Sequence, residues 1–468
     1  MTSDAAATAW VPDLTGRNRV KYLAVVEAIA AAVADGTLKP GDRLPTHRDL
    51  AWRLKVNTST ITQAYREAAR RHLVSGEVGR GTYVLADSAE AALFALKEPA
   101  GESGGPAGAP AVIDLSTNIP AATGADTDLA ATLAALVAED ATGGLTAYHP
   151  PVLLRRAAVA GARWLAERGL TLRPADVLPC AGAQQGLLEA LLALAGPGET
   201  VLVEEVTFPG MKALARQLRL KLHPLPLDRH GITPEGLDAA CRHTSARVAV
   251  LVPILQNPTA ATMDDARRHA IADVVRRHAL TVVEDDVYGG LTDTPPLAAL
   301  LPDHGVVVSG LAKIGAPGLR FGLIAGPPRL LAPIAAEAHT TSWPMSPLML
   351  EVACRWLDDG TIRRRRDAQR AEIAERRRLA ERLLGRALPP SPHQWLPTPG
   401  DAEATARAAR VAGVEVVPSA LFAAGRERPA AVRVSLTAAG SRRDLAVALE
   451  RLAPLLAPPL AAGGAELW

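Results

Sequence analysis

A lysine and an arginine seven residues apart form the most reactive pattern in this sequence. Lys313 opens the run Lys-Ile-Gly-Ala-Pro-Gly-Leu, and Arg320 follows directly. The Pro317-Gly318 turn between them lets an amine and a guanidinium share one small site. An amine condenses with an aldehyde, whereas a guanidinium keeps its proton and can grip a phosphate with two hydrogen bonds. The pair therefore predicts a site for a compound that carries both groups.

A glycine-containing motif offers a second anion contact. Ala181-Gly182-Ala183-Gln184-Gln185 follows the apolar run at 177–179 and precedes an apolar helix predicted over Leu187 to Leu194. Backbone amides at a helix start attract a phosphate, and Gly182 leaves room for its approach. On its own, this motif would favour a plain glycine-containing loop.

Polar and aromatic side chains at three other places suit a flat, charged ring. Phe208 could stack on such a ring. Asn257 could hydrogen-bond a phenolic oxygen, and Tyr288 could reach the same oxygen. Asp285 could pair with a protonated pyridine nitrogen and keep the ring an electron sink. Together with Lys313, these groups predict pyridoxal phosphate (PLP), although Asp285-Asp286 alone would also fit a solvated acidic loop.

Short apolar runs separated by amphipathic stretches must position these residues. Such runs are typical of buried strands in a mainly parallel sheet wrapped by helices. Ligands bind at the carboxyl ends of the strands in such sheets, which is where the motifs lie. The clearest runs are 200–203, 248–252, 281–284 and 306–308.

The first 85 residues follow another pattern. Apolar residues at helical spacing predict a helix over 20–33, which Asp35-Gly36 ends. The residues on its apolar face are Val20, Leu23, Val26, Ala30 and Val33. Thr46, three residues before Asp49, predicts the capped start of a short helix that reaches Leu54.

A second short helix and a hairpin follow. The next helix is predicted to bury Ile61, Ala64, Tyr65 and Ala68, and to expose the short polar side chains of Thr58, Ser59, Thr62, Gln63 and Arg66. Such side chains suit groove floors and phosphates. Gly79 and Gly81 flank Arg80 in a tight tip that could enter a minor groove. The turn, the helix and this hairpin tip, or wing, occur in the order of a DNA-binding domain. We favour this interpretation over a small helical subdomain whose polar face is only solvent-exposed.

Composition restricts the setting. The 468-residue chain is long enough for two or more domains, and its net charge of +2 places any DNA binding on a local patch. Three widely spaced cysteines match no metal pattern and suit a reducing cytoplasm. Neither a signal peptide nor an apolar run of eighteen residues is seen, so we expect a cytoplasmic protein without membrane contact. Residues 86–111, rich in Gly, Pro and Ala, predict a flexible linker.

Residues 18–85 resemble the GntR-type winged helix-turn-helix domain. The resemblance rests on Leu-Lys-Pro-Gly-Asp-Arg-Leu-Pro at 38–45, Arg-Asp-Leu-Ala at 48–51, Ala-Tyr-Arg-Glu at 64–67 and Val-Gly-Arg-Gly-Thr at 78–82. It implies binding to a double-stranded DNA operator. The implied contacts are Arg48, Asn57, Thr58, Ser59, Thr60, Thr62, Gly79 and Arg80. The family often has arginine where this chain has Thr58, so the operator sequence does not carry over.

Residues 112–460 resemble the fold-type I aminotransferases, which have a mainly parallel sheet with helices and a smaller α+β subdomain. With the first domain, the chain resembles a MocR-type regulator. The resemblance implies that Lys313 forms the Schiff base and that Arg433 binds the carboxylate of a small amino-group effector. It also implies a homodimer, in which Tyr148 reaches the partner's phosphate. The implied cofactor contacts are Gly182, Ala183, Gln184, Phe208, Asn257, Asp285, Tyr288, Arg320 and Tyr148.

Three departures separate the chain from active relatives. Gly310 and Ala312 stand where phosphate-binding hydroxyl residues are common, Ala260 replaces a glycine, and the segment after Tyr148 lacks one. We expect PLP binding to survive these changes. The favoured interpretation is a transcription regulator that senses an amine, or PLP itself. The alternatives are a working PLP-dependent aminotransferase with a DNA-binding module, and a cofactor-free scaffold that only dimerises; for Arg433, a surface salt bridge also stays open.

Overall fold

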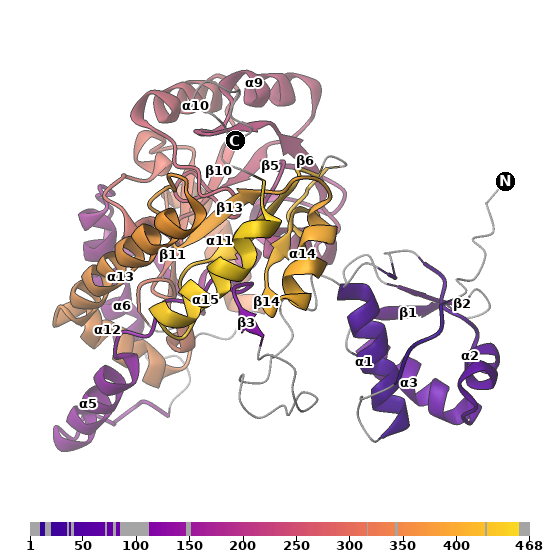
Figure 1. Ribbon diagram of the computed structural model, residues 1–468. Helices are drawn as coiled ribbons and strands as arrows, with labels where there is room; N and C mark the ends of the chain where they lie inside the picture. Colours follow the sequence, from indigo (N-terminus) through magenta and orange to yellow (C-terminus); the bar gives the residue numbers. More distant parts are fainter. Residues whose placement is uncertain are drawn as a thin grey trace.

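The computed structural model describes residues 10–14, 20–34, 37–38, 42–70, 73–77, 81–84, 112–146, 151–315, 317–341, 345–425 and 428–457. The predicted linker, Tyr148, Gly79 and Arg80 lie outside these residues. The described residues form an N-terminal helical unit with a hairpin and a larger α/β unit (Figure 1).

Within the described residues, the N-terminal unit has three helices and a two-stranded antiparallel sheet. Its elements are α1 (Lys21–Ala34), α2 (His47–Leu54), α3 (Thr58–Arg70), β1 (Val74–Glu77) and β2 (Gly81–Val84). Thr46 Oγ1 accepts a hydrogen bond from the Asp49 backbone amide at 3.2 Å, which confirms the predicted cap of α2. Lys55 ends α2 in the left-handed conformation, so that α3 can leave in a new direction.

The core of this unit follows the predicted pattern on α3. Ile61, Ala64, Tyr65 and Ala68 are buried, and the Tyr65 hydroxyl donates to the Pro45 carbonyl at 2.8 Å. The predicted inner face of α1 is wrong at its first position. Val20 is 47% exposed because it precedes the helix, and the buried face begins instead with residues 24–26.

The larger unit is built on a seven-stranded sheet of order β4-β12-β11-β10-β9-β5-β6. The strands are β4 (Val177–Cys180), β5 (Thr200–Glu204), β6 (Lys221–Leu225), β9 (Val248–Leu251), β10 (Thr281–Asp285), β11 (Gly305–Gly310) and β12 (Gly322–Ala325). β12 runs antiparallel to both of its neighbours, and the other neighbouring pairs are parallel. The sheet is mainly parallel, as predicted.

Alternation along the strands gives the sheet two apolar faces. Val201 and Val203 pack in one core cluster with residues of α7 (Ala183–Leu194), α8 (Pro209–Gln217) and α11 (Pro328–Thr341). Leu202, between them, packs in the opposite cluster with residues of α9 (Pro234–His243) and α10 (Asp265–Arg277). In Figure 1, α9 and α10 lie side by side. A third cluster includes residues of α6 (Pro151–Glu167) and α12 (Pro347–Asp358).

A smaller α+β subdomain completes the unit. Its three-stranded antiparallel sheet has the order β13 (His393–Pro397), β16 (Ala431–Ser435), β15 (Val417–Pro418). β3 (Ile113–Asp114) pairs in parallel with β14 (Val414–Glu415). Helices α13 (Thr361–Leu384), α14 (Ala402–Val411) and α15 (Arg442–Leu452) accompany these strands. Elsewhere in the larger unit lie α5 (Ala125–Ala138) and the pair β7 (Leu227–Asp228) and β8 (Gly231–Ile232). Residues 113–114 and this carboxyl-terminal subdomain thus share one small layer.

Candidate functional site

A cavity of about 380 Å³ lies among the residues that the sequence motifs single out. Asp285 ends β10, and Asn257 and Tyr288 follow β9 and β10. Because parallel strands end at the same edge of a sheet, residues from distant motifs meet there. The predicted residues in the cavity wall are Ala183, Gln184, Phe208, Asn257, Asp285, Tyr288, Lys313, Arg320 and Arg433. Other lining residues include Thr117, Asn118, Leu187, Gly310, Ala312 and Phe321.

Lys313 holds the reactive amine of this cavity. Its Nζ donates to the main-chain oxygen of Asn118 at 2.5 Å. Burial, together with the nearby Arg433, lowers the pKa of Lys313 to about 8, while Asp285 opposes the shift. About a tenth of the amine is therefore neutral at pH 7, and this is the form that attacks an aldehyde.

Asp285 is a buried carboxyl at the end of β10. Burial raises its pKa to about 7, and the Val287 backbone amide, which donates to Oδ1 at 3.3 Å, works against that rise. Asp286 is also buried, with an ion pair of 2.7 Å to Arg168. The interpretation of these two residues as a solvated acidic loop is therefore wrong. A buried carboxyl on the cavity wall suits a cationic partner such as a protonated ring nitrogen.

Arg433 reaches the cavity from β16. Its guanidinium donates to Asn257 Oδ1 at 3.0 Å and to the main-chain oxygen of Ser116, and lies 5.0 Å from the centre of the Phe422 ring. Only 5% of Arg433 is exposed, which excludes the surface salt bridge. Burial lowers its pKa to about 10. A buried guanidinium with spare N–H groups can bind a carboxylate.

The start of α7 and the Arg320 side chain lie close together at the site. Gly182 caps α7 at φ +87°, and a Cβ there would lie 2.6 Å from Arg320 Nη2. Arg320 Nη2 also donates to the Ala181 carbonyl at 3.3 Å. The first amides of a helix have no intrahelical acceptor, so amides and guanidinium converge on a place for an anion. α7 begins at Ala183, four residues before the predicted start.

The cavity fits PLP in its chemistry. An amine, a buried carboxyl, a guanidinium beside a helix start and an aromatic ring correspond to the aldehyde, ring nitrogen, phosphate and ring face. Three lining residues also carry a buried polar atom without a hydrogen-bond partner: Asn118 Oδ1, Gln184 Oε1 and Arg433 Nε. Unpaired buried polar groups are costly, and a polar ligand would satisfy them.

The departure at Gly310 has a local steric cause. A Cβ at this position would lie 2.9 Å from the main-chain oxygen of Phe321, which directly precedes the antiparallel neighbour strand β12. A serine or threonine would require this backbone to shift. Ala312, by contrast, lines the cavity, where its methyl group offers no hydrogen bond.

Asn118 and His393 are polar residues of the site that sequence reasoning missed. Asn118 lines the cavity and contacts both Lys313 and Tyr288. His393 lies with its ring centre 5.1 Å from that of Tyr288, and its Nε2 is 2.9 Å from the Gln256 carbonyl. Burial lowers the pKa of His393 to about 3, so its ring is neutral and Nε2–H donates. The polar run Ser116-Thr117-Asn118, just after Leu115, was the available signal for Asn118.

Unlike the cavity residues, most of the predicted DNA-contacting residues that the structure describes are exposed. Arg48, Asn57, Thr58 and Ser59 are exposed around α2 and the start of α3, and Thr60 is half-buried. Thr62 Oγ1 donates to the Thr58 carbonyl at 3.0 Å, so its hydroxyl hydrogen is used within the helix. β1 and β2 pair antiparallel, with Glu77 opposite Gly81, and so flank the predicted wing tip.

The larger unit has the architecture of the fold-type I aminotransferases. It resembles the crystal structure of an archaeal alanine:glyoxylate aminotransferase with a TM-score of 0.68 at 21% identity, over 74% of this chain and 91% of that chain. Residues 110–452 match the family of aminotransferases class I and II, and the chain belongs to this family. The class I and II fold is generally PLP-dependent.

The N-terminal residues 21–84 match the family of bacterial regulatory proteins called gntR. The HTH-type transcriptional regulator YdeF of Bacillus subtilis is 27% identical over 96% of this chain and 96% of its own length. The vitamin B6 salvage pathway transcriptional repressor PtsJ of Salmonella typhimurium is 27% identical over 82% and 86%. This pairing of domains confirms the predicted MocR-type architecture. Among the described helices, none has the length and apolar character needed to cross a bilayer.

Proposed function

We propose that this protein is a cytoplasmic transcription regulator that binds operator DNA and senses an amino-group ligand, or PLP itself, in the cavity around Lys313. The observation that carries the proposal is the convergence of Lys313, Asp285, Arg320 and Arg433 on one cavity. Because the same chain carries a GntR-type domain, ligand binding in the cavity would act on DNA binding. The regulatory names of YdeF and PtsJ support the same conclusion.

The chain's own residues would hold PLP as follows. Lys313 would bind the aldehyde, Asp285 the ring nitrogen, and Asn257 with Tyr288 the ring oxygen. Phe208 would cover the ring. When bound, PLP supplies an aldehyde that condenses reversibly with primary amines. Phosphate contacts would come from Gly182, Ala183, Gln184 and Arg320, and from Tyr148 across a homodimer.

Arg433 would select effectors with a carboxylate. Its guanidinium comes from β16 of the small subdomain, whereas Lys313 follows β11 of the large sheet, and both residues line the cavity. An amine that competes with Lys313 and a carboxylate held by Arg433 would bring both ends of one small molecule into the site. Such a ligand shifts the regulator only by the difference in its affinity for the two DNA-binding states.

The DNA-contacting surface would consist of Arg48, Asn57, Thr58, Ser59, Thr60 and Thr62, with Gly79 and Arg80 at the wing. Aminotransferase-like domains often dimerise. A homodimer would bring two such surfaces to two half-sites of an operator. The arrangement of the two operator half-sites would then reflect the two-fold symmetry of the protein.

The decisive experiment is an absorbance titration of the purified protein with PLP, beside the variant Lys313→Ala. We expect a protein-bound visible band in the wild type that the variant lacks completely, with unchanged operator binding in the absence of PLP. Amino acids and simple amines are then screened for a shift of this band and of operator affinity. Identical spectra for the two proteins, without a bound band, would leave the cofactor-free scaffold as the function of the larger unit.

A second candidate function is PLP-dependent transamination. It is favoured because the residues predicted for a half-reaction line one cavity in an aminotransferase fold. Release of a 2-oxo acid and regeneration by a second 2-oxo acid would establish it. A spectral shift without release of product favours the regulator.

A further inference from the structure

Asn118 contacts two of the residues proposed to hold the cofactor, and no motif assigned it a role. Its main-chain oxygen accepts from Lys313 Nζ at 2.5 Å, and its side-chain Nδ2 donates to the Tyr288 hydroxyl at 2.8 Å. Asn118 lines the cavity and is 8% exposed. One residue therefore contacts both the amine and the phenol of the site.

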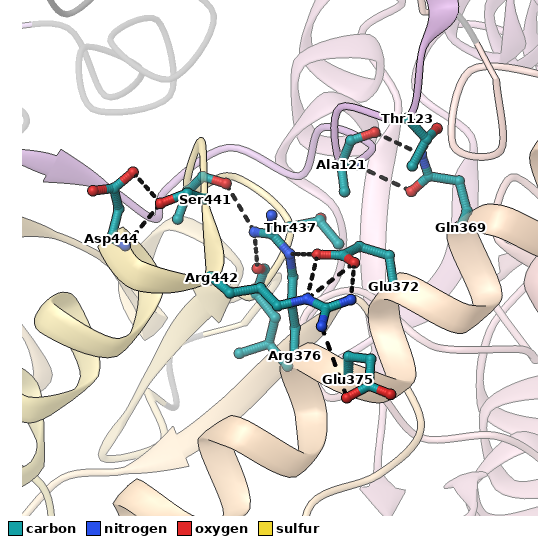
Figure 2. A network of polar contacts seen from close by, with 12 residues as sticks. Ala121, Thr123, Gln369, Glu372, Glu375, Arg376, Thr437, Ser441, Arg442 and Asp444 are labelled. Carbon is teal, nitrogen blue, oxygen red and sulfur yellow. Dashed lines mark hydrogen bonds and ion pairs between the residues drawn. The ribbon is translucent and has the colours of Figure 1, made fainter.

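The segment that carries Asn118 is fixed on both sides. Before it, β3 pairs with β14, and the Ser116 carbonyl accepts from Arg433. After it, Gln369 of α13 bonds both the amide and the carbonyl of Ala121, at 3.1 and 2.6 Å (Figure 2). Gln369 is fully buried, so its amide cannot exchange these bonds for water. These main-chain contacts on both sides therefore fix the position of Asn118.

The side chain of Asn118 determines which way the Tyr288 hydroxyl can act. A tyrosine hydroxyl has one hydrogen to donate and lone pairs that accept. Because Asn118 Nδ2 donates to the Tyr288 oxygen, the hydroxyl hydrogen is left for another acceptor. Burial raises the pKa of Tyr288 to about 12, which keeps that hydrogen in place at neutral pH. A donor beside the cavity suits an oxygen with negative charge.

The main-chain carbonyl of Asn118 acts on the amine. It takes one N–H of Lys313, which lies with Nζ 5.6 Å from the centre of the Tyr288 ring. In the neutral amine the lone pair is not part of this bond and stays available to an aldehyde. Amine and phenol are therefore oriented relative to each other by one residue.

We propose that Asn118 is a positioning residue for this site, whose amide makes Tyr288 a hydrogen-bond donor to the ring oxygen of the cofactor and whose carbonyl orients the Lys313 amine. The inference rests on the proposed function, since it takes PLP as the ligand. It adds a residue that lies in the first segment of the larger unit and outside the aminotransferase-like motifs.

Side-chain variants of Asn118 test its action on Tyr288, because the carbonyl belongs to the main chain. Asn118→Asp has nearly the same shape but only acceptor atoms, so Tyr288 must turn its hydrogen to the new carboxylate. We expect the Kd for PLP, from absorbance titration, to rise about tenfold, and by about fivefold for Asn118→Ala. A residue that only fills space would show the reverse order, with Asn118→Asp close to wild type.

A double-mutant cycle separates this role from a general loss of packing. If Asn118 acts through Tyr288, Asn118→Ala costs PLP affinity in the wild type and nothing further in Tyr288→Phe. Losses that simply add, or an Asn118→Asp protein that binds PLP like the wild type, overturn the inference. Operator affinity and the thermal unfolding midpoint report folding, and the Asn118→Ala cycle suffices if Asn118→Asp does not fold. A wild type that binds no PLP overturns the proposed function itself.

Discussion

The predicted DNA-contacting surface and the cavity around Lys313 place their functional side chains in opposite surroundings. Arg48, Thr58 and Ser59 are exposed to water. Arg433 and Asp285 are buried, and both have strongly shifted pKa values. DNA is a large ligand that must come to a surface, whereas a small ligand can be enclosed and held by groups removed from water.

This difference predicts different behaviour under mutation. An exposed side chain contributes little to folding, so its loss affects binding alone. A buried charged residue is held by partners, so its loss leaves those partners unsatisfied and also destabilises the protein.

The largest effect is expected at the surface. Arg48→Ala should weaken specific operator binding by about 1–3 kcal/mol, or about 5- to 150-fold, with PLP binding and thermal unfolding unchanged. Binding is measured by fluorescence anisotropy at fixed salt concentration. Arg53→Ala is the matched control, because it removes the same charge from the same helix, where Asp49 holds Arg53 at 3.0 Å. Equal losses for both variants would mean that charge alone, and not the Arg48 contact, matters.

The second prediction concerns pH and the cavity. Since the pKa of Lys313 is lowered to about 8, the share of neutral amine falls about tenfold for each pH unit below that value. The rate of appearance of the bound PLP band should fall accordingly towards pH 6 and level off above pH 8, as followed by stopped-flow absorbance. Arg433→Gln removes one cause of the lowered pKa and should move the plateau to higher pH. A rate that keeps rising about tenfold per pH unit beyond pH 9, as for an unburied lysine, would contradict the lowered pKa of Lys313.

A third prediction isolates the anion end of the cavity. Gly182→Ala should raise the Kd for PLP about tenfold, because its Cβ displaces the Arg320 guanidinium from the start of α7. Gly198→Ala is the control: its φ of +86° nearly equals the +87° of Gly182, but nothing lies within 4 Å of its Cβ. Both variants should lower the unfolding temperature, and only Gly182→Ala should weaken PLP binding. Equal PLP affinities would show that the Arg320 contact is unimportant.

The smallest effects should come from two matched helix caps. Thr46 Oγ1 caps α2, and Thr233 Oγ1 caps α9 by accepting from the Gly236 amide at 3.2 Å. Each Thr→Ala change should cost about 1 kcal/mol of folding free energy, measured by denaturant titration. Only Thr46→Ala should also weaken operator binding, since α2 carries Arg48. An operator affinity unaffected by Thr46→Ala would mean that Arg48 does not depend on the cap.

The sequence predicted the elements of this fold better than the contacts between them. Apolar runs located β5, β9, β10 and β11, and Thr46 located the start of α2. The bond between Arg433 and Asn257 joins residues 176 positions apart, which local patterns do not relate. Asn118 was missed because β3, with only two residues, produces no periodicity around it. Tertiary packing decides such contacts, and a single sequence records it only indirectly.

The carbonyls of Ser116 and Asn118 have a consequence for the evolution of this segment. Both bind a cation, Arg433 and Lys313 respectively, through atoms that every amino acid possesses. Substitution of Ser116 therefore leaves the hydrogen bond from Arg433 to its main-chain carbonyl intact. Insertion or deletion of one residue between β3 and Asn118 would instead move a carbonyl away from its cation. Related chains should accordingly vary in the side chain at position 116, while the length of the segment stays constant.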